Sequence, residues 1–388
     1  MVALRSHIDF ESNKFLMFVI DQIANEKERA GEDVIRMTLG KSELPLNPQI
    51  IAAMERALGN YAMYTQVYPA GLPELREAIA RYNNEKYALK LSPRNILIGC
   101  GTSSIFRNLF QILAAPGDEV LLPLPYYSLY SFCSQLVNAK TRYYQIDLDH
   151  LELDLDSFEQ NFTEKTKIVV INTPGNPLGN VLTEADLTAI DQIVAGRAVI
   201  INDEIYSNTY FDEPSRSVLQ LKNMKSTFVT TNAFSKAYRM YTRRVGYCIV
   251  PEELEVPLTV IQHHTLLTLD PVVQYGALEA LKHEGDVEAL TATYRSRRNH
   301  TIEKFNGVAS VRALPAKGSF YLTLDCTDYI RDRDIDTSLD LAQQIIRATN
   351  IATVPGSDFG IPKTLRLSYS SSKYKEGIDG LVDFFRAN

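Results

Sequence analysis

Short runs of apolar residues without polar alternation recur between helical stretches from about Asn95 onward. Val and Ile dominate these runs, which is typical of strands that are buried on both faces of a parallel sheet. The helical stretches between them imply β-α-β units. The pattern therefore predicts an α/β core with a seven-stranded, mostly parallel sheet. The predicted strands are Ile96–Gly99, Glu119–Pro123, Thr141–Asp147, Lys167–Asn172, Ala198–Asp203, Phe228–Asn232 and Val245–Val250.

The pattern changes after Pro271. One long helical stretch is predicted from about Val272 to Phe305, followed by a mixed α+β region that ends near Phe385. A chain of 388 residues is about twice the usual size of one domain. We therefore predict two interleaved domains: a large α/β domain over residues 46–280, and a smaller α+β domain made of residues 1–45 and 281–388. A helical stretch over Phe15–Arg29 is predicted in the first of these smaller segments.

Composition narrows the possible functions. The net charge is −7 and no block of Lys or Arg stands out, so a nucleic-acid-binding surface is not expected. The charged start of the chain and the lack of about 18 consecutive apolar residues predict a cytoplasmic protein without a membrane span. The four cysteines lack any Cys-x-x-Cys pair, and His263 and His264 form no metal-spaced cluster, so no metal site is expected.

Residues whose side chains could bind a ligand or take part in catalysis follow the predicted strands. Open α/β sheets place their binding sites at these strand ends. Each motif alone is also compatible with an ordinary turn, helix cap or core position. Their order along the chain is much more specific than any single motif. In sequence they are Gly101-Thr102-Ser103, Pro125-Tyr126-Tyr127, Asn176-Pro177-Leu178-Gly179, Asp203-Glu204-Ile205-Tyr206, Ser235-Lys236, Arg244 and Arg366.

Taken in this order, the series resembles the class I and II aminotransferases, an aspartate-aminotransferase-like family of pyridoxal-phosphate (PLP) fold type I. The resemblance covers nearly the whole chain, from Leu39-Gly40 to Arg366 and the residues that follow it. It implies that PLP is the cofactor and that Lys236 holds it as a Schiff base. It also implies transfer of an amino group between an L-amino acid and a 2-keto acid, in a homodimer.

The resemblance assigns catalytic roles to Asp203 and Tyr206 besides Lys236. A carboxylate at the end of a parallel strand can keep the cofactor's pyridine nitrogen protonated, which makes the ring an electron sink. The Tyr206 phenol is expected to bind the 3-oxygen of the same ring. Tyr127 matches the aromatic residue that stacks on the ring.

A phosphate site is expected where a strand, a glycine turn and a helix follow one another. Gly101, Thr102 and Ser103 place backbone N–H groups and two hydroxyls at the start of the helix, where anions bind favourably. Arg244 adds a planar cation that suits a doubly charged phosphate, and Ser235 an adjoining hydroxyl.

The substrate is expected to contact Gly40, Asn176 and Arg366. Arg366 matches the family arginine that binds the substrate α-carboxylate through two hydrogen bonds. Asn176 matches the residue that contacts both the ring oxygen and that carboxylate. By analogy, the peptide bonds Leu124–Pro125 and Asn176–Pro177 are expected to be cis.

Some positions depart from the family pattern. Leu178 and Ala233 stand where a threonine and a phosphate-binding serine are common. Gln66 occupies the place of the tyrosine that relatives lend to the partner subunit's phosphate, so that either Tyr64 or Tyr68 could replace it.

An alternative function follows from two acidic residues. Asp270 and Glu11 could face a cationic side chain such as a guanidinium. The alternative is a PLP-dependent lyase or cyclase that acts by elimination or cyclodehydration on a basic amino acid, for instance a hydroxyarginine.

Overall fold

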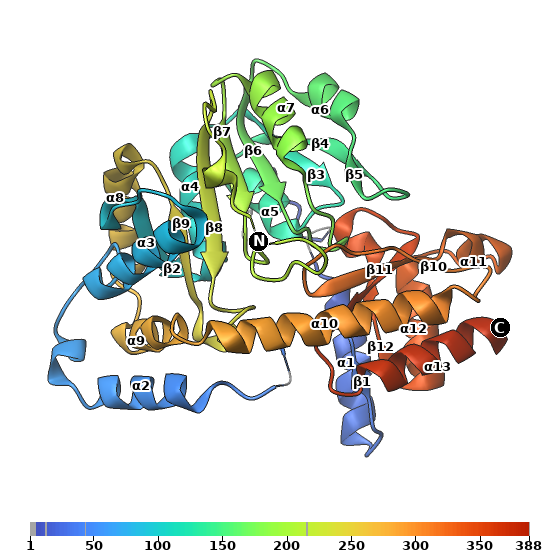
Figure 1. Cartoon of the computed structure of the whole chain (residues 1–388). Coiled ribbons are helices and arrows are strands. Elements are labelled where there is room, and N and C mark those ends of the chain that lie inside the picture. Colours follow the sequence, from blue (N-terminus) through green and yellow to red (C-terminus); the bar gives the residue numbers. More distant parts are fainter. Residues whose placement is uncertain (1–4, 12–13, 43, 215, 388) are drawn as a thin grey trace.

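A broad twisted sheet with helices on both faces lies beside a smaller sheet with its own helices (Figure 1). The computed structural model describes residues 5–387 except 12–13, 43 and 215. Within them, the large sheet has eight strands in the order β2-β9-β8-β7-β6-β3-β4-β5. The strands are β2 (Ile96–Cys100), β3 (Glu119–Leu124), β4 (Lys140–Asp147), β5 (Glu152–Leu153), β6 (Thr166–Asn172), β7 (Val199–Asp203), β8 (Thr227–Ala233) and β9 (Val245–Ile249).

The central strands β8, β7, β6, β3 and β4 pair in parallel. Strand β9 runs antiparallel to both β8 and β2. The carboxyl end of β2 and the beginning of β9 therefore lie at the same edge as the carboxyl ends of the parallel strands. The predicted α/β class and mostly parallel sheet are confirmed.

Helices cover both faces of this sheet because alternate side chains of each strand point to opposite sides. On β6, Ile168 and Val170 pack in a hydrophobic cluster with α4, α5 and α8, whereas Val169 and Ile171 pack in another with α6 and α7. At the β2–β9 end, a further cluster includes side chains of α3 and α9. These helices are α3 (Pro73–Tyr87), α4 (Gly101–Leu113), α5 (Ser128–Leu136), α6 (Leu155–Asn161), α7 (Glu184–Val194), α8 (Glu255–Leu266) and α9 (Pro271–Ala280).

The smaller part has a separate hydrophobic cluster. It draws on residues 20–37 and 290–385, together with Tyr206 and Phe211. Its sheet has the order β10-β11-β14-β13, and β1 pairs in parallel with β12. The predicted domain boundaries remain a prediction. The elements are α1 (Met17–Arg29), β1 (Ile35–Arg36), α10 (Glu284–Phe305), β10 (Arg312–Ala313), β11 (Tyr321–Asp325), α11 (Thr327–Asp332), α12 (Ser338–Thr349), β12 (Ile351–Ala352), β13 (Val354–Pro355), β14 (Thr364–Ser368) and α13 (Tyr374–Ala387).

Two details differ from the sequence prediction. The large sheet contains all seven predicted strands plus β5, whose two residues are too few to leave a pattern. The single helix predicted over Val272–Phe305 is wrong, because the structure has α9 and α10 with a break at residues 281–283. Glu284 and Asp286 in the first turn of α10 favour a new helix start at this point.

Helix α2 (Pro48–Leu58) lies along α9 at the lower left of Figure 1 and continues into the short 3-10 helix η1 (Tyr61–Tyr64). Across the described part of the chain, no helix is both long enough and apolar enough to cross a membrane.

Candidate active site

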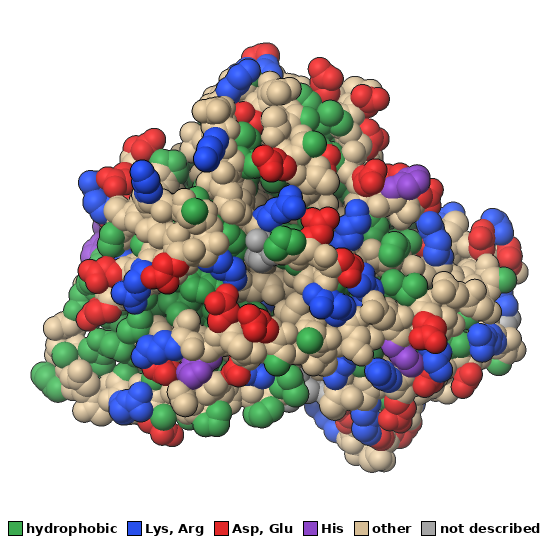
Figure 2. Space-filling view, viewed as in Figure 1, with side chains coloured by type: hydrophobic (Ala, Val, Ile, Leu, Met, Phe, Trp, Pro, Cys, Tyr) green, Lys and Arg blue, Asp and Glu red, His purple; other side chains and the backbone are tan. Residues whose placement is uncertain are grey.

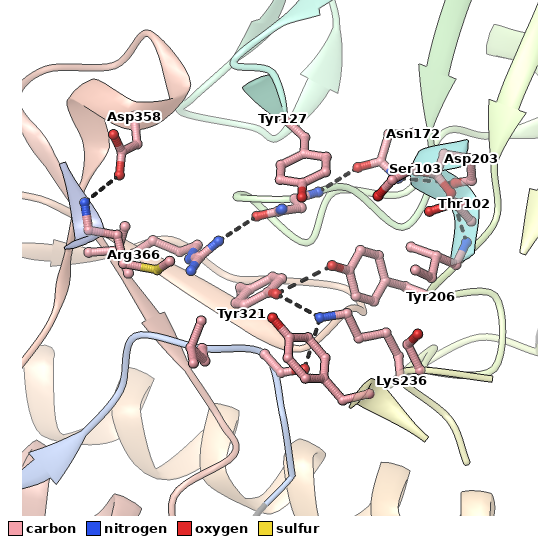
Figure 3. A pocket seen from close by; sticks show the side chains of 18 of the residues that line it. Thr102, Ser103, Tyr127, Asn172, Asp203, Tyr206, Lys236, Tyr321, Asp358 and Arg366 are labelled. Carbon is pink, nitrogen blue, oxygen red and sulfur yellow. Dashed lines mark hydrogen bonds between the residues drawn. The ribbon is translucent and has the colours of Figure 1, made fainter. Parts of the chain in front are cut away.

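The strand ends bring nearly all the predicted residues into one cavity of about 530 Å³. Lys236 follows β8, Asp203 ends β7, and Arg244 directly precedes β9. Arg366 reaches the cavity from β14 in the smaller sheet. Figure 3 shows Lys236, Asp203 and Arg366 converging from both parts of the chain. The lining also includes the predicted Gly40, Thr102, Ser103, Tyr127, Asn176, Tyr206 and Ser235.

Lys236 is buried, and its amine faces the cavity. Its Nζ donates hydrogen bonds to the carbonyl of Gly40 at 2.8 Å and to the Tyr321 hydroxyl at 3.3 Å. Aromatic rings surround the amine, with the Tyr241 ring centroid 5.2 Å away. The arrangement holds a buried primary amine in a fixed position at the cavity, as a nucleophilic lysine requires.

Asp203 is buried at the end of β7. Its carboxylate accepts hydrogen bonds from the Tyr130 hydroxyl at 2.7 Å and the Thr231 hydroxyl at 3.0 Å. Burial raises the pKa of this carboxyl to about 6, although both hydroxyl donors lower it. The site thus presents a carboxylate whose charge would be stabilised by a cationic partner.

The residues expected to bind a phosphate lie together where α4 begins, and we call them the anion cradle. Thr102 and Ser103 lie in its first turn, and Arg244 donates from Nη1 to the Tyr241 carbonyl at 3.1 Å. Gly101 does not itself line the cavity, but it has a φ of +67°, and a Cβ there would lie 2.4 Å from Arg244 Nη2. Glycine at this position therefore allows the guanidinium to approach the helix N-terminus.

Arg366 is held over the opposite end of the cavity. Its Nη1 donates to Asn176 Oδ1 at 3.1 Å, and its Nη2 donates to the Thr38 carbonyl at 2.6 Å. The backbone N–H of Asn176 is bound by the side chain of Asn172 at 2.8 Å. The buried Arg366 Nε lacks a hydrogen-bond partner in the described structure. An incoming anion could satisfy that donor.

The start of α1 closes one side of the cavity. Phe15 and Phe18 line it, and the Phe15 ring centroid lies 6.4 Å from that of Tyr127. Asp358 accepts hydrogen bonds from the backbone N–H groups of Leu16 and Met17, at 2.7 and 2.9 Å. Two distant parts of the sequence therefore meet at the mouth of the site.

Several lining residues were assigned no role from the sequence, among them Tyr130, Asn172, Tyr321 and Asp358. Asn172 ends a predicted strand just as Asp203 does, so the strand-end argument could have found it. The other three depend on tertiary packing, which short-range patterns do not carry. The expected cis bonds at Leu124–Pro125 and Asn176–Pro177 are present, and Thr173–Pro174 is also cis.

The acidic residues invoked for a cationic substrate lie elsewhere. Asp270 caps α9 by accepting a hydrogen bond from the Val272 N–H, and Glu11 pairs with Lys14. Neither lines the cavity of its own chain. Their geometry within one chain gives no support to a guanidinium site.

Comparison with known proteins identifies the family. Residues 32–385 match the family model of aminotransferase class I and II. The chain belongs to this family. A probable aspartate/prephenate aminotransferase of Aquifex aeolicus is 32% identical over 368 residues, which cover 92% of each chain. The aspartate aminotransferase of Thermotoga maritima is 30% identical over 375 residues, covering 95% of this chain and 96% of the relative.

Solved aminotransferase structures share the whole fold. A double mutant of the Thermus thermophilus aspartate aminotransferase superposes with a TM-score of 0.88 at 26% identity and covers 100% of both chains. The Thermotoga maritima aspartate aminotransferase has the same TM-score at 27% identity, covering 99% of this chain and 100% of the other. The predicted resemblance and fold type I are therefore confirmed. These findings support an aminotransferase and give no support to the lyase or cyclase alternative.

Proposed function

We propose that this aminotransferase uses PLP, bound covalently through Lys236, to transfer the amino group of an L-amino acid to a 2-keto acid. The observation that carries the proposal is the single cavity that joins the Lys236 amine, the Asp203 carboxylate, the anion cradle and Arg366. Relatives named as aspartate aminotransferases make aspartate with 2-oxoglutarate the first substrate pair to test.

The residues present fit PLP in charge and shape. The cradle at the start of α4, with Thr102, Ser103 and Arg244, suits a phosphate, because Gly101 leaves the guanidinium room beside the helix. At the far side, buried Asp203 suits a protonated ring nitrogen, which would hold its carboxyl in the charged form. In this proposal Ser235 adds to the phosphate site, Tyr127 packs against the ring, and Tyr206 and Asn176 bind the ring oxygen.

PLP bound in this cavity would supply an electron sink for the electron pair left when the substrate's Cα–H bond breaks. Once the substrate amine has replaced Lys236 on the cofactor, the freed Lys236 Nζ would remove the proton from the substrate Cα. It would then deliver that proton to the cofactor carbon that carries the substrate nitrogen. Arg366 binds the substrate carboxylate through its guanidinium, with Asn176 and Gly40 beside it. Binding of the carboxylate by Arg366 sets which substrate bond faces Lys236. The buried side chains that line the cavity exclude water from the reacting atoms.

The proposal includes a homodimer. Large apolar side chains are exposed on α2 and η1: Ile51 is 41% exposed, Leu58 56% and Tyr61 79%. Figure 2 shows hydrophobic side chains gathered over this region at the lower left. An exposed apolar surface of this kind commonly marks a protein interface. Tyr64, one of the two tyrosines that could reach the partner subunit's phosphate, is also exposed there, and its hydroxyl donates to the Leu58 carbonyl. A cytoplasmic location remains a prediction from the sequence.

The function is tested by supplying PLP and a panel of L-amino acids, with and without a 2-keto acid acceptor. The proposal expects keto-acid formation in repeated turnovers only when the acceptor is present. Repeated turnover of a basic amino acid without any acceptor would instead support a lyase or cyclase. The dimer is tested by analytical ultracentrifugation of Leu58→Asp, with Leu155→Asp as a control at an exposed leucine of α6.

A further inference from the structure

Tyr321 occupies the centre of the cavity but belongs to the smaller sheet. Its hydroxyl oxygen accepts hydrogen bonds from Lys236 Nζ at 3.3 Å and from the Tyr206 hydroxyl at 3.4 Å (Figure 3). A Cβ on Gly40 would lie 2.0 Å from that oxygen and 2.8 Å from Lys236 Nζ. The absence of a side chain at Gly40 therefore lets the phenol and the amine meet.

Two cations favour negative charge on this phenol. The Arg366 guanidinium lies 4.1 Å above the ring centroid of Tyr321, and the Lys236 amine faces its oxygen. Burial alone would raise the pKa of Tyr321, but the charges of Lys236 and Arg366 outweigh burial and lower it to about 8.

The other titratable groups around Tyr321 come from different elements. Tyr206 follows β7, Tyr127 precedes α5, Tyr241 begins the 3-10 helix η4 (Tyr241–Arg243), and Tyr294 lies on α10. Burial raises the pKa of each of these phenols above its ordinary value. Burial therefore favours the neutral form of each of these phenols, whereas the charges of Lys236 and Arg366 favour the phenolate form of Tyr321.

We propose that Tyr321 is a catalytic proton carrier that exchanges a proton with Lys236 during transamination. The inference rests on the proposed role of Lys236. The Lys236 ammonium gives a proton to the Tyr321 phenolate: an N–H bond breaks, an O–H bond forms, and both groups become neutral. The freed nitrogen lone pair can then accept the proton from the substrate Cα, and the reverse transfer restores the starting pair. No other reactant is needed.

The first test titrates the tyrosinate absorbance of the cofactor-free protein. Subtracting the titration of Tyr321→Phe from that of the wild type is expected to reveal one phenol that ionises near pH 8. The matched control is Tyr241→Phe, which removes a neighbouring phenol with a raised pKa and is expected to leave the ionisation near pH 8 in place. A wild-type-minus-Tyr321→Phe difference without any ionisation below about pH 10 would overturn the proposal.

The second test measures kcat and KM of the PLP-loaded enzyme across pH. For Tyr321→Phe we expect kcat to fall by about 100-fold, with a smaller change in KM and an acid limb displaced to higher pH. Because Phe keeps the ring, the packing under Arg366 is retained. Placing 3-fluorotyrosine at position 321 preserves the shape, lowers the phenol's intrinsic pKa, and is expected to move the limb to lower pH.

The proton-carrier role would be contradicted if Tyr321→Phe left kcat and its pH profile unchanged. It would also be contradicted if 3-fluorotyrosine at position 321 did not move the acid limb of the pH profile. A wild-type enzyme that neither binds PLP nor transaminates would instead contradict the proposed function. The absorbance titration of the cofactor-free protein separates the two, because it reports the pairing of Tyr321 and Lys236 without any turnover.

Discussion

The Tyr130 hydroxyl donates a 2.7 Å hydrogen bond to the buried carboxylate of Asp203. Burial raises the pKa of Asp203 to about 6, and this bond opposes the rise. Tyr130→Phe removes a donor to a charged group, an interaction worth about 2 kcal/mol. We therefore expect kcat/KM at neutral pH to fall by about 10-fold and its acid limb to move to higher pH. Steady-state kinetics across pH provides the measurement.

Tyr144→Phe is the matched control for this prediction. Tyr144 is also a buried phenol, but it donates to the Val170 carbonyl at 3.0 Å and not to Asp203. We expect it to leave the pH profile in place. If both variants shift the profile equally, the Tyr130–Asp203 bond does not tune the carboxylate.

Arg366→Lys should damage substrate binding and spare the cofactor. Lysine keeps the positive charge but lacks the planar pair of donors that binds a carboxylate bidentately. We expect KM for the amino acid to rise by about 100-fold, while the PLP absorption spectrum stays unchanged. Arg312→Lys, on a partly exposed ion pair with Asp149, serves as the control. A changed spectrum with normal KM would contradict the assignment.

Glu204 gives a pH-dependent contribution to stability. It is buried, and its carboxylate accepts a 2.9 Å hydrogen bond from the Val218 N–H and a 3.0 Å bond from Ser217. Burial still raises its pKa from 4.5 to about 7. Since the folded state binds this proton more tightly, the resulting stabilisation is complete below about pH 4.5 and is lost as the pH rises through about 7.

Glu204→Gln removes this titration. Urea unfolding of the cofactor-free protein at pH 5 and pH 8 is the measurement. The wild type is expected to lose more unfolding free energy between the two pH values than the variant does. Glu164→Gln, at an exposed position paired with Arg197, controls for loss of a carboxylate. Equal losses in wild type and Glu204→Gln would rule out this contribution.

The sequence predicted the part of the site that depends on strand ends. Asp203 and Asn176 follow buried runs of Val and Ile, and Lys236 follows the predicted strand Phe228–Asn232. One topological argument therefore brings all three to a common edge of the sheet. Arg366 was found only through the ordered resemblance, because its place over the cavity depends on how the smaller sheet packs.

The roles of Tyr321 and Asp358 were not predicted from the sequence, for the same reason. Tyr321 looks like a core residue in an alternating strand, and Asp358 like a loop acid, until the smaller sheet is placed over the large one. The break between α9 and α10 was missed because residues 281–283 contain neither proline nor glycine, the usual local signals of a helix end. Local sequence patterns cannot predict the contacts of Tyr321 and Asp358, because these contacts join residues that are far apart in the chain.

Lys236 is proposed to carry PLP covalently. The most direct measurement is borohydride reduction of the PLP-loaded protein, followed by proteolysis and mass spectrometry of the peptides. We predict a pyridoxyl phosphate adduct on Lys236. Lys236→Ala is expected to lose both this adduct and the near-visible absorption band. An adduct on another lysine, or a band that persists in Lys236→Ala, would contradict it.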